Sequence, residues 1–349
     1  MVLFLYSEIA SYTLSCVNEL LKRGEEVQII RWPVNAEAPF EFDFDGLEVL
    51  ERNQFTDAEL IEHVEKLSPD IIISSGWMDK GYLKVNRAMM GKVPTVLTLD
   101  NHWRGDTKQK LAAVVSPLFL KKRFSHVWVP GAPQKTFAHK LRFKEDDIYT
   151  GFYSADFDLF NGYYKSFRER KNQSFPKVLL YLGRYIEHKG IFDMWKAFIE
   201  IQEEEPNDWE FWCFGTGDQW DQRLEHPKIK HHGFVQPHEL GPYIEQSGAY
   251  ILPSHFEPWG VSLHEFAAAG FPLLSSVEVG ASEAFLEDGK NGYSFEAGSV
   301  SEIKAAMQKI MRLSQEEWMA MQEHSVKLAS RITPAIWADT LQEIKSRGL

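Results

Sequence analysis

Short apolar runs recur along this chain of 349 residues, and the segments between them are long enough to form helices. Strands that alternate with crossover helices build parallel sheets, so this alternation constrains the fold more than any other feature. The first half has five such runs: VLFLY, EVQIIRW, PDIIISS, VPTVLTL and HVWVP. After a polar stretch over residues 165–176, the second half has five more: KVLLYLG, WEFWCFG, IKHHGFV, GAYILPS and FPLLSS.

The alternation predicts an α/β chain of two Rossmann-like domains, each a doubly wound parallel sheet. Two domains also suit the length, because a chain of this size exceeds what one hydrophobic core usually fills. We place the first domain at residues 1–165 and the second at residues 166–334. A helix over residues 335–349, following Pro334, is predicted to pack back on the first domain.

Several classes of protein are disfavoured by what the sequence lacks. Neither half carries G-x-G-x-x-G after its first strand, and there is no P-loop, so a nicotinamide or flavin enzyme has no support. The two cysteines, Cys16 and Cys213, lie in apolar stretches of different halves and offer no disulfide framework or zinc site. We expect no cofactor and no metal.

The sequence carries no signal for export or for a membrane span. The opening MVLFLYSEIASY has no basic segment of the kind that starts a signal peptide, and it reads as a buried strand. No apolar run approaches the roughly 20 residues that cross a bilayer. A cytoplasmic protein is expected.

Charge is distributed unevenly along the chain. The net charge of −12 argues against a general nucleic-acid binder, yet residues 77–144 carry 14 Lys and Arg against 3 Asp and Glu. Within them, residues 108–124 place apolar side chains among cations: Leu111, Val114, Val115, Leu118 and Phe119 among Lys108, Lys110, Lys121, Lys122 and Arg123. Such a segment fits peripheral contact with the inner, anionic face of a membrane. The alternative is an ordinary amphipathic helix that covers the first sheet and is interrupted at Pro117.

The motif LGRYIEHKG gathers two cations at the end of the first strand of the second half. The strand ends at Gly183, Arg184 follows at once, and Lys189 lies five positions further on. Ligands of open α/β sheets bind outside the carboxyl ends of the strands, and a helix starting near Gly190 would direct free N–H groups there. A diphosphate fits such a site, although two surface cations in a loop would have the same spacing.

The motif HFEPWGVSLHEFAAAGFPLL contains two glutamates separated by seven residues. Glu257 follows a strand and precedes a Pro-Trp-Gly turn, and Glu265 lies in a helix of apolar and small residues. A buried helical carboxylate needs hydrogen-bond donors, and sugar or ribose hydroxyls are such donors. The amides of Gly260, Val261 and Ser262, at the helix N-terminus, are predicted to face a phosphate or a sugar ring.

Together with FGTGD (214–218), HGFV (232–235) and GASEAFLEDGKNGYSF (280–295), these motifs resemble the donor half of family 4 of the retaining GT-B glycosyltransferases. The resemblance covers about residues 178–296, and the first domain matches only in architecture. It implies a GT-B fold whose two domains face a central cleft. It further implies that Arg184 and Lys189 bind the donor diphosphate, that Glu265 binds the ribose, and that Glu257 contacts the transferred sugar or stabilises positive charge on its ring.

The resemblance implies further donor contacts in the same half. Gly183, Gly215 and Gly217 would let the backbone approach the nucleotide, and Phe234 and Val235 would lie near the base. Trp259 differs from the residue common in its turn, and its bulk is predicted to shape the sugar pocket. Glu283 is interpreted as structural support for the adjacent loop.

The acceptor is expected on the first domain, at loops that follow its strands. Ser7 and Glu8 follow the opening strand, where a Gly-rich loop common in the family is missing. Asp100, Asn101 and His102 follow VLTL, with Trp103 next, and either Asp100 or His102 would take the place of a His that relatives often have there.

The sequence thus predicts a retaining glycosyltransferase that moves a hexose-type sugar from a nucleotide diphosphate sugar to a glycan or lipid-linked acceptor. UDP is favoured over GDP on family frequency, and cell-surface polysaccharide or glycan biosynthesis is the expected context. No DxD-like metal site appears in a fitting context, so metal-independent transfer is expected. The alternatives are a sugar-nucleotide 2-epimerase of the same fold and a non-catalytic protein that binds nucleotide sugars.

Overall fold

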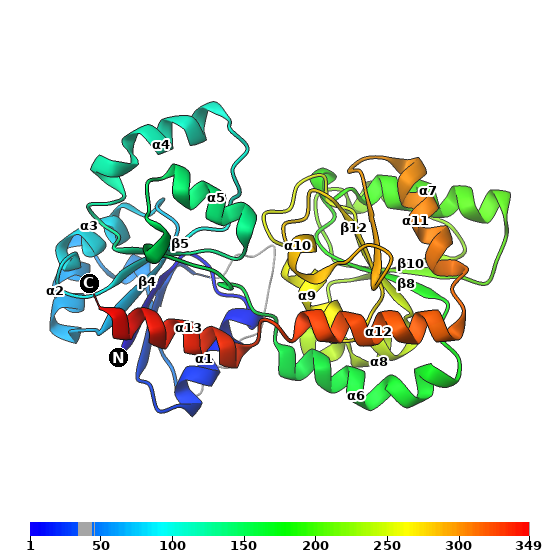
Figure 1. Cartoon of the computed structure of the whole chain (residues 1–349), viewed down its shortest axis with the longest axis horizontal. Helices are drawn as coiled ribbons and strands as arrows, with labels where there is room; N and C mark the ends of the chain where they lie inside the picture. Colours follow the sequence, from blue (N-terminus) through cyan, green and yellow to red (C-terminus); the bar gives the residue numbers. More distant parts are fainter. Residues whose placement is uncertain (34–43, 45, 349) are drawn as a thin grey trace. The chain divides into compact units, whose positions relative to one another are not determined.

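The computed structural model describes residues 1–33, 44 and 46–348 of the chain. It divides into two compact units, one formed by Met1–Ser154 with Pro334–Leu349 and the other by Ala155–Thr333. Each unit has its own parallel sheet with helices on both faces (Figure 1). The predicted pair of doubly wound α/β domains is therefore confirmed.

The described part of the first unit contains a seven-stranded sheet in the order β3-β2-β1-β4-β5-β6-β7, with every neighbouring pair parallel. Its strands are β1 (Val2–Tyr6), β2 (Val27–Arg31), β3 (Glu48–Glu51), β4 (Ile71–Ser75), β5 (Thr95–Thr98), β6 (His126–Trp128) and β7 (Ile148–Tyr149). Its helices are α1 (Ser11–Lys22), α2 (Asp57–Leu67), α3 (Lys80–Met89), α4 (Thr107–Phe119), α5 (Ala132–Lys140) and α13 (Pro334–Arg347). The order reverses between β1 and β4, and loops at such a reversal form the usual ligand crevice of this architecture.

Strand β1 supplies apolar side chains to the cores on both faces of the sheet. Val2, Phe4 and Tyr6 join the cluster that contains residues of α1 and α13, whereas Leu3 and Leu5 join the cluster that contains residues of α2 and α3. This alternation follows from the two-residue period of a strand, and burial on both faces explains why β1 reads as an unbroken apolar run.

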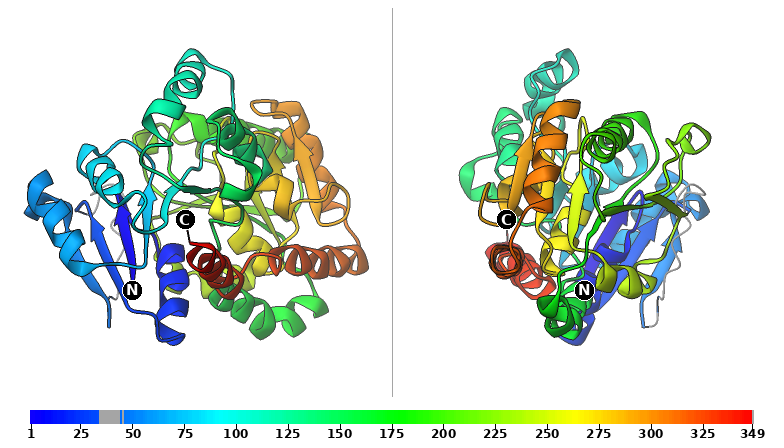
Figure 2. Two further views of the ribbon diagram at one scale, coloured as in Figure 1. Left: turned by 60° about the vertical axis from the view of Figure 1, so that its left-hand side comes forward. Right: turned by 90° about the vertical axis from the view of Figure 1, so that its right-hand side faces the viewer.

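Helix α13 lies beside α1 in this unit, as Figure 1 and Figure 2 show. Trp337 is buried, its ring stacks on Trp128 with centroids 4.8 Å apart, and its Nε1 donates to the carbonyl of Phe152 at 2.7 Å. Ala338, Leu341 and Ile344 of the same helix are buried in the same core, which fixes α13 on the unit.

The described part of the second unit contains a six-stranded parallel sheet in the order β10-β9-β8-β11-β12-β13. Its strands are β8 (Val178–Leu182), β9 (Glu210–Phe214), β10 (Ile229–Gly233), β11 (Ala249–Leu252), β12 (Leu273–Ser276) and β13 (Gly292–Phe295). Its helices are α6 (Phe157–Gln173), α7 (Ile191–Glu204), α8 (Gly241–Gln246), α9 (Val261–Ala268), α10 (Ser282–Phe285), α11 (Val300–Met311) and α12 (Gln315–Ala329). Helices α7 and α11 pack together, while α9 packs against α6 and α12 (Figure 1).

The two units divide at Ser154, whereas the sequence placed the change of domain at residue 166, which lies inside α6. Residues 165–173 belong to α6, and their sequence is polar because much of this part of the helix is exposed. The start of α6 packs on the second unit: Phe160 contacts the ring of Phe266, and Asn161 donates to the carbonyl of Ala268 at 3.3 Å.

Helix α4 runs through Pro117 without interruption and ends at Phe119. Of its residues only Ser116 is buried, while Leu111, Val114 and Leu118 are 63%, 76% and 72% exposed. Leu111, Val114 and Leu118 therefore do not cover the sheet as an ordinary amphipathic helix would, whereas Ala112 and Phe119 of the same helix pack against the core of this unit.

Candidate active site

The predicted donor residues come from separate motifs, and the sheet of the second unit brings them to one edge. Gly183 follows β8, Gly215 follows β9, Phe234 follows β10, and Glu257 lies in the loop after β11. These four strands are parallel neighbours, so their carboxyl ends lie along the same edge. Ligands of open α/β sheets bind at this edge.

Lys189 and Glu257 form an ion pair in this site. Lys189 ends a short 3₁₀ helix, η3 (Glu187–Lys189), and its Nζ donates to Oε2 of Glu257. Both side chains are 15% exposed, and Ser254 Oγ donates to the same oxygen at 3.4 Å. The structure thus joins two residues that lie 68 positions apart, and an anionic ligand would compete with Glu257 for the ammonium group.

Gly190 allows this pairing. It has a φ of 67°, and a Cβ placed on it would lie 2.2 Å from the carbonyl oxygen of Pro253. Only glycine fits such a close approach in this left-handed conformation. The loop after β8 can therefore come close to the loop after β11, which carries Glu257.

The first turn of α7 and Arg184 lie next to this pair in the chain. No side chain among the described residues caps α7, so its first N–H groups are available to an anion. Arg184 is exposed, and its carbonyl accepts a hydrogen bond from Tyr181 Oη at 3.0 Å. The two cations of the first motif are thus on loops whose backbone is fixed by buried partners.

Gly215 and Gly217 allow the loops of the site to pack on one another. A Cβ on Gly215, which has a φ of 123°, would lie 1.9 Å from the carbonyl oxygen of Gly183, and a Cβ on Gly217 would lie 2.3 Å from that of Tyr185. The N–H of Gly215 donates to the carbonyl of Gly233 at 2.6 Å. The close backbone approach predicted for these glycines therefore occurs between loops of the protein, and their approach to a nucleotide stays a prediction.

Glu265 is a buried carboxyl without a donor in the described part of the chain. It lies in α9, is 8% exposed, and no described residue donates a hydrogen bond to its carboxyl group or forms an ion pair with it. Burial, with a smaller contribution from the charge of Asp156, raises the pKa of Glu265 to about 8. Ligand hydroxyl groups could supply the missing hydrogen bonds, which is the chemistry predicted for this residue.

The raised pKa predicts how the stability of the chain depends on pH. The folded chain holds the Glu265 proton up to about pH 8, whereas a solvated carboxyl releases it near 4.5, so wild-type stability should fall across this interval. Glu265→Gln cannot ionise and should become the more stable protein at pH 9, by on the order of 2–4 kcal/mol, with no such gain at pH 4. Urea unfolding at both pH values measures the difference.

Glu283→Gln is the matched control, because Glu283 is an exposed carboxyl of the same unit and should show no gain at either pH. An equal pH profile for wild type and Glu265→Gln would show that the buried carboxyl does not titrate as described.

The predicted donor residues of the Pro-Trp-Gly turn and of the helix that follows it lie around the start of α9. Gly260 has a φ of 93° and precedes Val261, the first residue of the helix. Ser262 Oγ accepts a hydrogen bond from Tyr250 Oη at 2.8 Å. Trp259 is buried and its ring lies edge-on to Phe285 of α10, with centroids 6.1 Å apart, so it packs inside the domain.

Three further residues named from the sequence lie in other segments. Phe234 and Val235, which follow β10, are partly buried. Glu283 of α10 is exposed, and its side chain has no hydrogen bond or ion pair to any described residue that would support its loop.

The predicted acceptor-side residues follow β1 and β5 in the first unit. The N–H of Ser7 donates to Ser75 Oγ at 2.8 Å, which links the ends of β1 and β4, and Glu8 is exposed. Asp100 accepts hydrogen bonds from Tyr153 Oη at 3.3 Å and from Asn101 Nδ2 at 3.2 Å. The carbonyl of His102 accepts from Gln109 Nε2 at 2.7 Å. Asp100 is thus held by a partly buried tyrosine. The side chain of Trp103 packs against Phe137.

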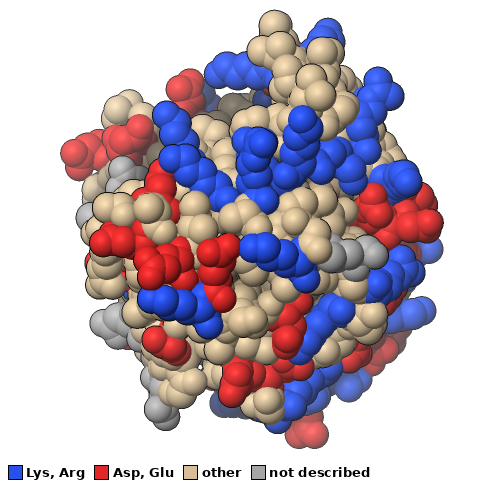
Figure 3. Space-filling view, turned by 90° about the vertical axis from the view of Figure 1, so that its left-hand side faces the viewer, with Lys and Arg blue, Asp and Glu red and all other residues tan. Residues whose placement is uncertain are grey.

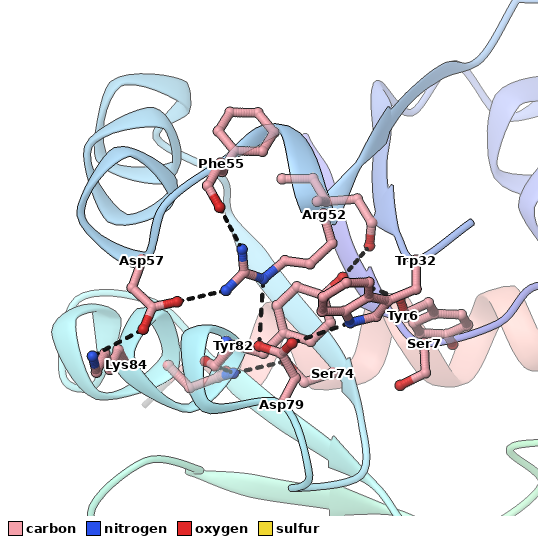
Figure 4. A network of polar contacts seen from close by, with 12 residues as sticks. Tyr6, Ser7, Trp32, Arg52, Phe55, Asp57, Ser74, Asp79, Tyr82 and Lys84 are labelled. Atoms are coloured by element: carbon pink, nitrogen blue, oxygen red, sulfur yellow. Dashed lines mark hydrogen bonds and ion pairs between the residues drawn. The ribbon is translucent and has the colours of Figure 1, made fainter.

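Sequence reasoning missed a polar network at the same edge of this sheet, drawn in Figure 4. The guanidinium of Arg52 pairs with Asp57 at 2.5 Å and with Asp79 at 3.5 Å, and Trp32 Nε1 donates to Asp79 at 3.1 Å. These residues come from four different segments of the chain, so no local sequence motif could predict that they interact. The one available signal was Trp32 itself, the last residue of the predicted strand EVQIIRW, which the structure places just beyond β2.

Among the residues that the structure describes, no group of three or more His, Cys, Asp or Glu is arranged to hold a metal ion. In the same residues, no helix combines the length and apolar character that crossing a membrane requires.

Comparisons with known proteins show similarity to glycosyltransferases. The family model of glycosyl transferases group 1 matches residues 165–327. The glycogen synthase of Mycobacterium tuberculosis is 32% identical to this chain over 152 residues, which cover 42% of this chain and 36% of that enzyme. The alpha-monoglucosyldiacylglycerol synthase of Acholeplasma laidlawii is 24% identical over 265 residues, which cover 67% of this chain and 65% of that enzyme. The chain thus matches little more than a third of the length of the first of these relatives.

A solved structure extends the likeness to the whole chain. Anabaena Alr3699/HepE in complex with UDP and glucose superposes with a TM-score of 0.75 at 14% identity, over 99% of this chain and 100% of that one. At this identity the likeness establishes the fold. Residues 165–327 thus match the model of the glycosyl transferases group 1 family, on a chain that has the GT-B fold.

Proposed function

We propose that this chain is a retaining glycosyltransferase of family 4, with the nucleotide-sugar donor bound by the second unit and the acceptor by the first. The observation that carries the proposal is the arrangement after β8 and β11, where Lys189 and Glu257 are paired, together with the buried carboxyl of Glu265 on the helix that follows. A diphosphate needs cations and a ribose needs hydrogen-bond acceptors, and this edge of the sheet offers both.

In the proposed reaction the acceptor oxygen forms a bond to the anomeric carbon as the bond from that carbon to the diphosphate oxygen breaks. The acceptor hydroxyl gives its proton to the departing phosphate, on the same face of the sugar, so no protein base is required. Arg184, Lys189 and the first N–H groups of α7 stabilise the negative charge that develops on the leaving group. Glu257, released from Lys189, binds the sugar hydroxyls or stabilises the positive charge on the ring.

A UDP-sugar is the proposed donor, with a GDP-sugar as the alternative, and the sugar is a hexose. Support comes from the solved structure of Alr3699/HepE, whose fold this chain shares and which holds UDP and glucose. The acceptor is proposed to be a glycan or a lipid-linked sugar. We propose a cytoplasmic enzyme of cell-surface polysaccharide or glycan biosynthesis.

The proposal is tested by incubating the chain with a panel of UDP-, GDP- and ADP-hexoses in excess EDTA. We expect one of the UDP-sugars to be turned over, by slow hydrolysis without an acceptor, and we expect EDTA to change the rate little because cationic side chains neutralise the diphosphate. Release of nucleoside diphosphate measures turnover. Activity that EDTA abolishes and Mg²⁺ or Mn²⁺ restores would contradict the metal-independent mechanism.

The same assay separates the alternatives. A sugar-nucleotide 2-epimerase would change the sugar while it stays on the nucleotide, which NMR of the donor detects. A non-catalytic binding protein would show donor-dependent thermal stabilisation without turnover. Release of nucleoside diphosphate with unchanged sugar stereochemistry in the remaining donor is expected only for a transferase.

A peripheral membrane contact is the second part of the proposal, and α4 carries it. Leu111, Val114, Val115 and Leu118 are all exposed on this helix, and Figure 3 shows uncharged surface at the top of this unit, where Figure 1 places α4, with Lys and Arg side chains gathered nearby. The apolar side chains suit the acyl boundary of a bilayer, and the cations suit anionic headgroups.

Liposome co-sedimentation tests this contact. We expect the chain to pellet with phosphatidylglycerol vesicles at low salt, and binding to weaken as the salt concentration rises. Leu111→Ser with Leu118→Ser should reduce pelleting at least ten-fold, since both side chains are exposed and their loss leaves the core intact. Ile336→Ser is the control, because Ile336 is an exposed apolar residue of another helix. Equal, negligible pelleting with anionic and neutral vesicles would end the proposal.

A further inference from the structure

A row of residues crosses the carboxyl edge of the sheet in the first unit, and strand register defines it. Tyr6 pairs with Arg31, and Arg31 pairs with Glu51. The next residues of these three parallel strands are Ser7, Trp32 and Arg52, which therefore follow one another across the edge. Trp32 lies one strand beyond Ser7, on the side away from β5 and its Asp100.

Trp32 is exposed and yet held in a defined position. Its side chain is 40% exposed, its Nε1 donates to Asp79 Oδ2 at 3.1 Å, and the guanidinium carbon of Arg52 lies 5.8 Å from the ring centroid. The hydrogen bond fixes the edge of the indole and the cation lies over its ring. A tryptophan with these two contacts and a large exposed fraction loses little further freedom on binding a ligand.

The partners of Trp32 are themselves fixed. Arg52 is buried and pairs with Asp57 and Asp79, and its Nη1 donates to the carbonyl of Phe55 at 2.7 Å (Figure 4). Asp79 also caps α3, because its Oδ1 accepts from the N–H of Tyr82 at 2.7 Å.

The guanidinium of Arg52 packs closely against the backbone of Gly81. A Cβ on Gly81 would lie 2.0 Å from Nη2 of Arg52, so the absence of a side chain there lets the guanidinium reach its carboxylates. The buried ion pair of Arg52 with Asp79, which requires glycine at position 81, thus fixes the position of the exposed indole of Trp32.

A rigid, solvent-facing indole at a ligand-binding edge suits the apolar C–H face of a sugar ring. Stacking of such a face on an aromatic ring gains buried apolar area at small entropic cost. The order β2-β1-β4-β5 separates Trp32 from Asp100 by three strand spacings, which is about 14 Å. One pyranose ring does not cover that distance, whereas an oligosaccharide does.

We propose that Trp32 stacks on a sugar unit of the acceptor remote from the hydroxyl that reacts, so that the acceptor is a glycan of several units. This inference rests on the proposed function, since it assigns the acceptor to this edge of the first unit. Trp32 contacts substrate, and Asp79 and Arg52 are positioning residues that act through it.

The experiment compares acceptors of increasing length. Glucan, galactan and mannan oligosaccharides of one to four units are supplied with the UDP-hexose that the chain hydrolyses, and kcat/KM is measured for each. We expect kcat/KM to rise with length for one series, and Trp32→Ala to remove that rise, with at least a ten-fold loss on the tetrasaccharide and little change on the single sugar. Trp32→Phe should retain much of the rise, and Ile336→Ala, at a residue of similar exposure, all of it.

Saturation-transfer NMR of the same oligosaccharides, without donor, separates this inference from the proposed function. If wild type turns over no donor, the proposed function fails, yet stronger binding of a longer oligosaccharide that Trp32→Ala abolishes would still support the subsite. The subsite is refuted if no series shows a length dependence, or if Trp32→Ala affects single sugars and oligosaccharides equally. Unchanged donor hydrolysis in Trp32→Ala shows that the second unit is intact.

Discussion

Lys189→Met is expected to slow sugar transfer by on the order of 10²-fold or more, and Arg184→Met by a similar factor, because each removes a cation from the leaving diphosphate. The effect should fall mainly on kcat, since the charge on the diphosphate grows as its bond to the sugar breaks. Initial rates at saturating donor, followed by release of nucleoside diphosphate, provide the measurement.

Lys290→Met serves as the control for these variants. Lys290 is an exposed cation of the same unit that pairs with Glu287 three positions away, and its loss should leave the rate unchanged. Thermal unfolding confirms that each variant is folded. Wild-type rates in both Lys189→Met and Arg184→Met would show that the diphosphate binds elsewhere.

Arg52→Met should lower the free energy of unfolding by about 3–5 kcal/mol, because it leaves the carboxylate of Asp79 buried without its cation. Methionine keeps most of the side-chain volume, so the loss reports charge more than packing. Urea unfolding measures the change.

Lys84→Met is the matched control for Arg52→Met. Lys84 pairs with Asp57 at 2.9 Å at the outside of the same network and is itself exposed, so its loss should cost no more than about 0.5 kcal/mol. Equal effects of the two substitutions would show that the network is solvated and that Trp32 is not held by it.

The strands that the sequence predicted best are those buried on both faces. VLFLY and KVLLYLG read as continuous apolar runs because helices cover both sides of β1 and β8. The strands β3, β7 and β13 were not foreseen: β3 is EVLE at the edge of its sheet, and β7 has only two residues. Edge and short strands carry too little apolar sequence to be distinguished from loops.

In the candidate site, the sequence predicted the local motifs but not the contacts between residues far apart in the chain. The motifs around Lys189 and Glu257 were recognised separately, each from its place after a strand, but their direct pairing depends on how closely two loops approach at Gly190 and Pro253. For the acceptor side, the contact of Trp32 with Asp79 requires the register of β1, β2 and β4, which a single sequence does not reveal. Trp32 itself was one of 11 tryptophans, most of which could equally be core residues.

The place of α13 in the fold has a consequence for how the chain is made. The first unit takes this helix from beyond the whole second unit, and Trp337 completes the stack on Trp128. During synthesis the ribosome must therefore deliver all of Ala155–Thr333 before the earlier unit can close its core, so the unit translated second is able to fold first. Until then the α13-facing surface of β1 and α1 stays open to solvent, and nascent chains are most exposed to chaperones and proteases in that interval.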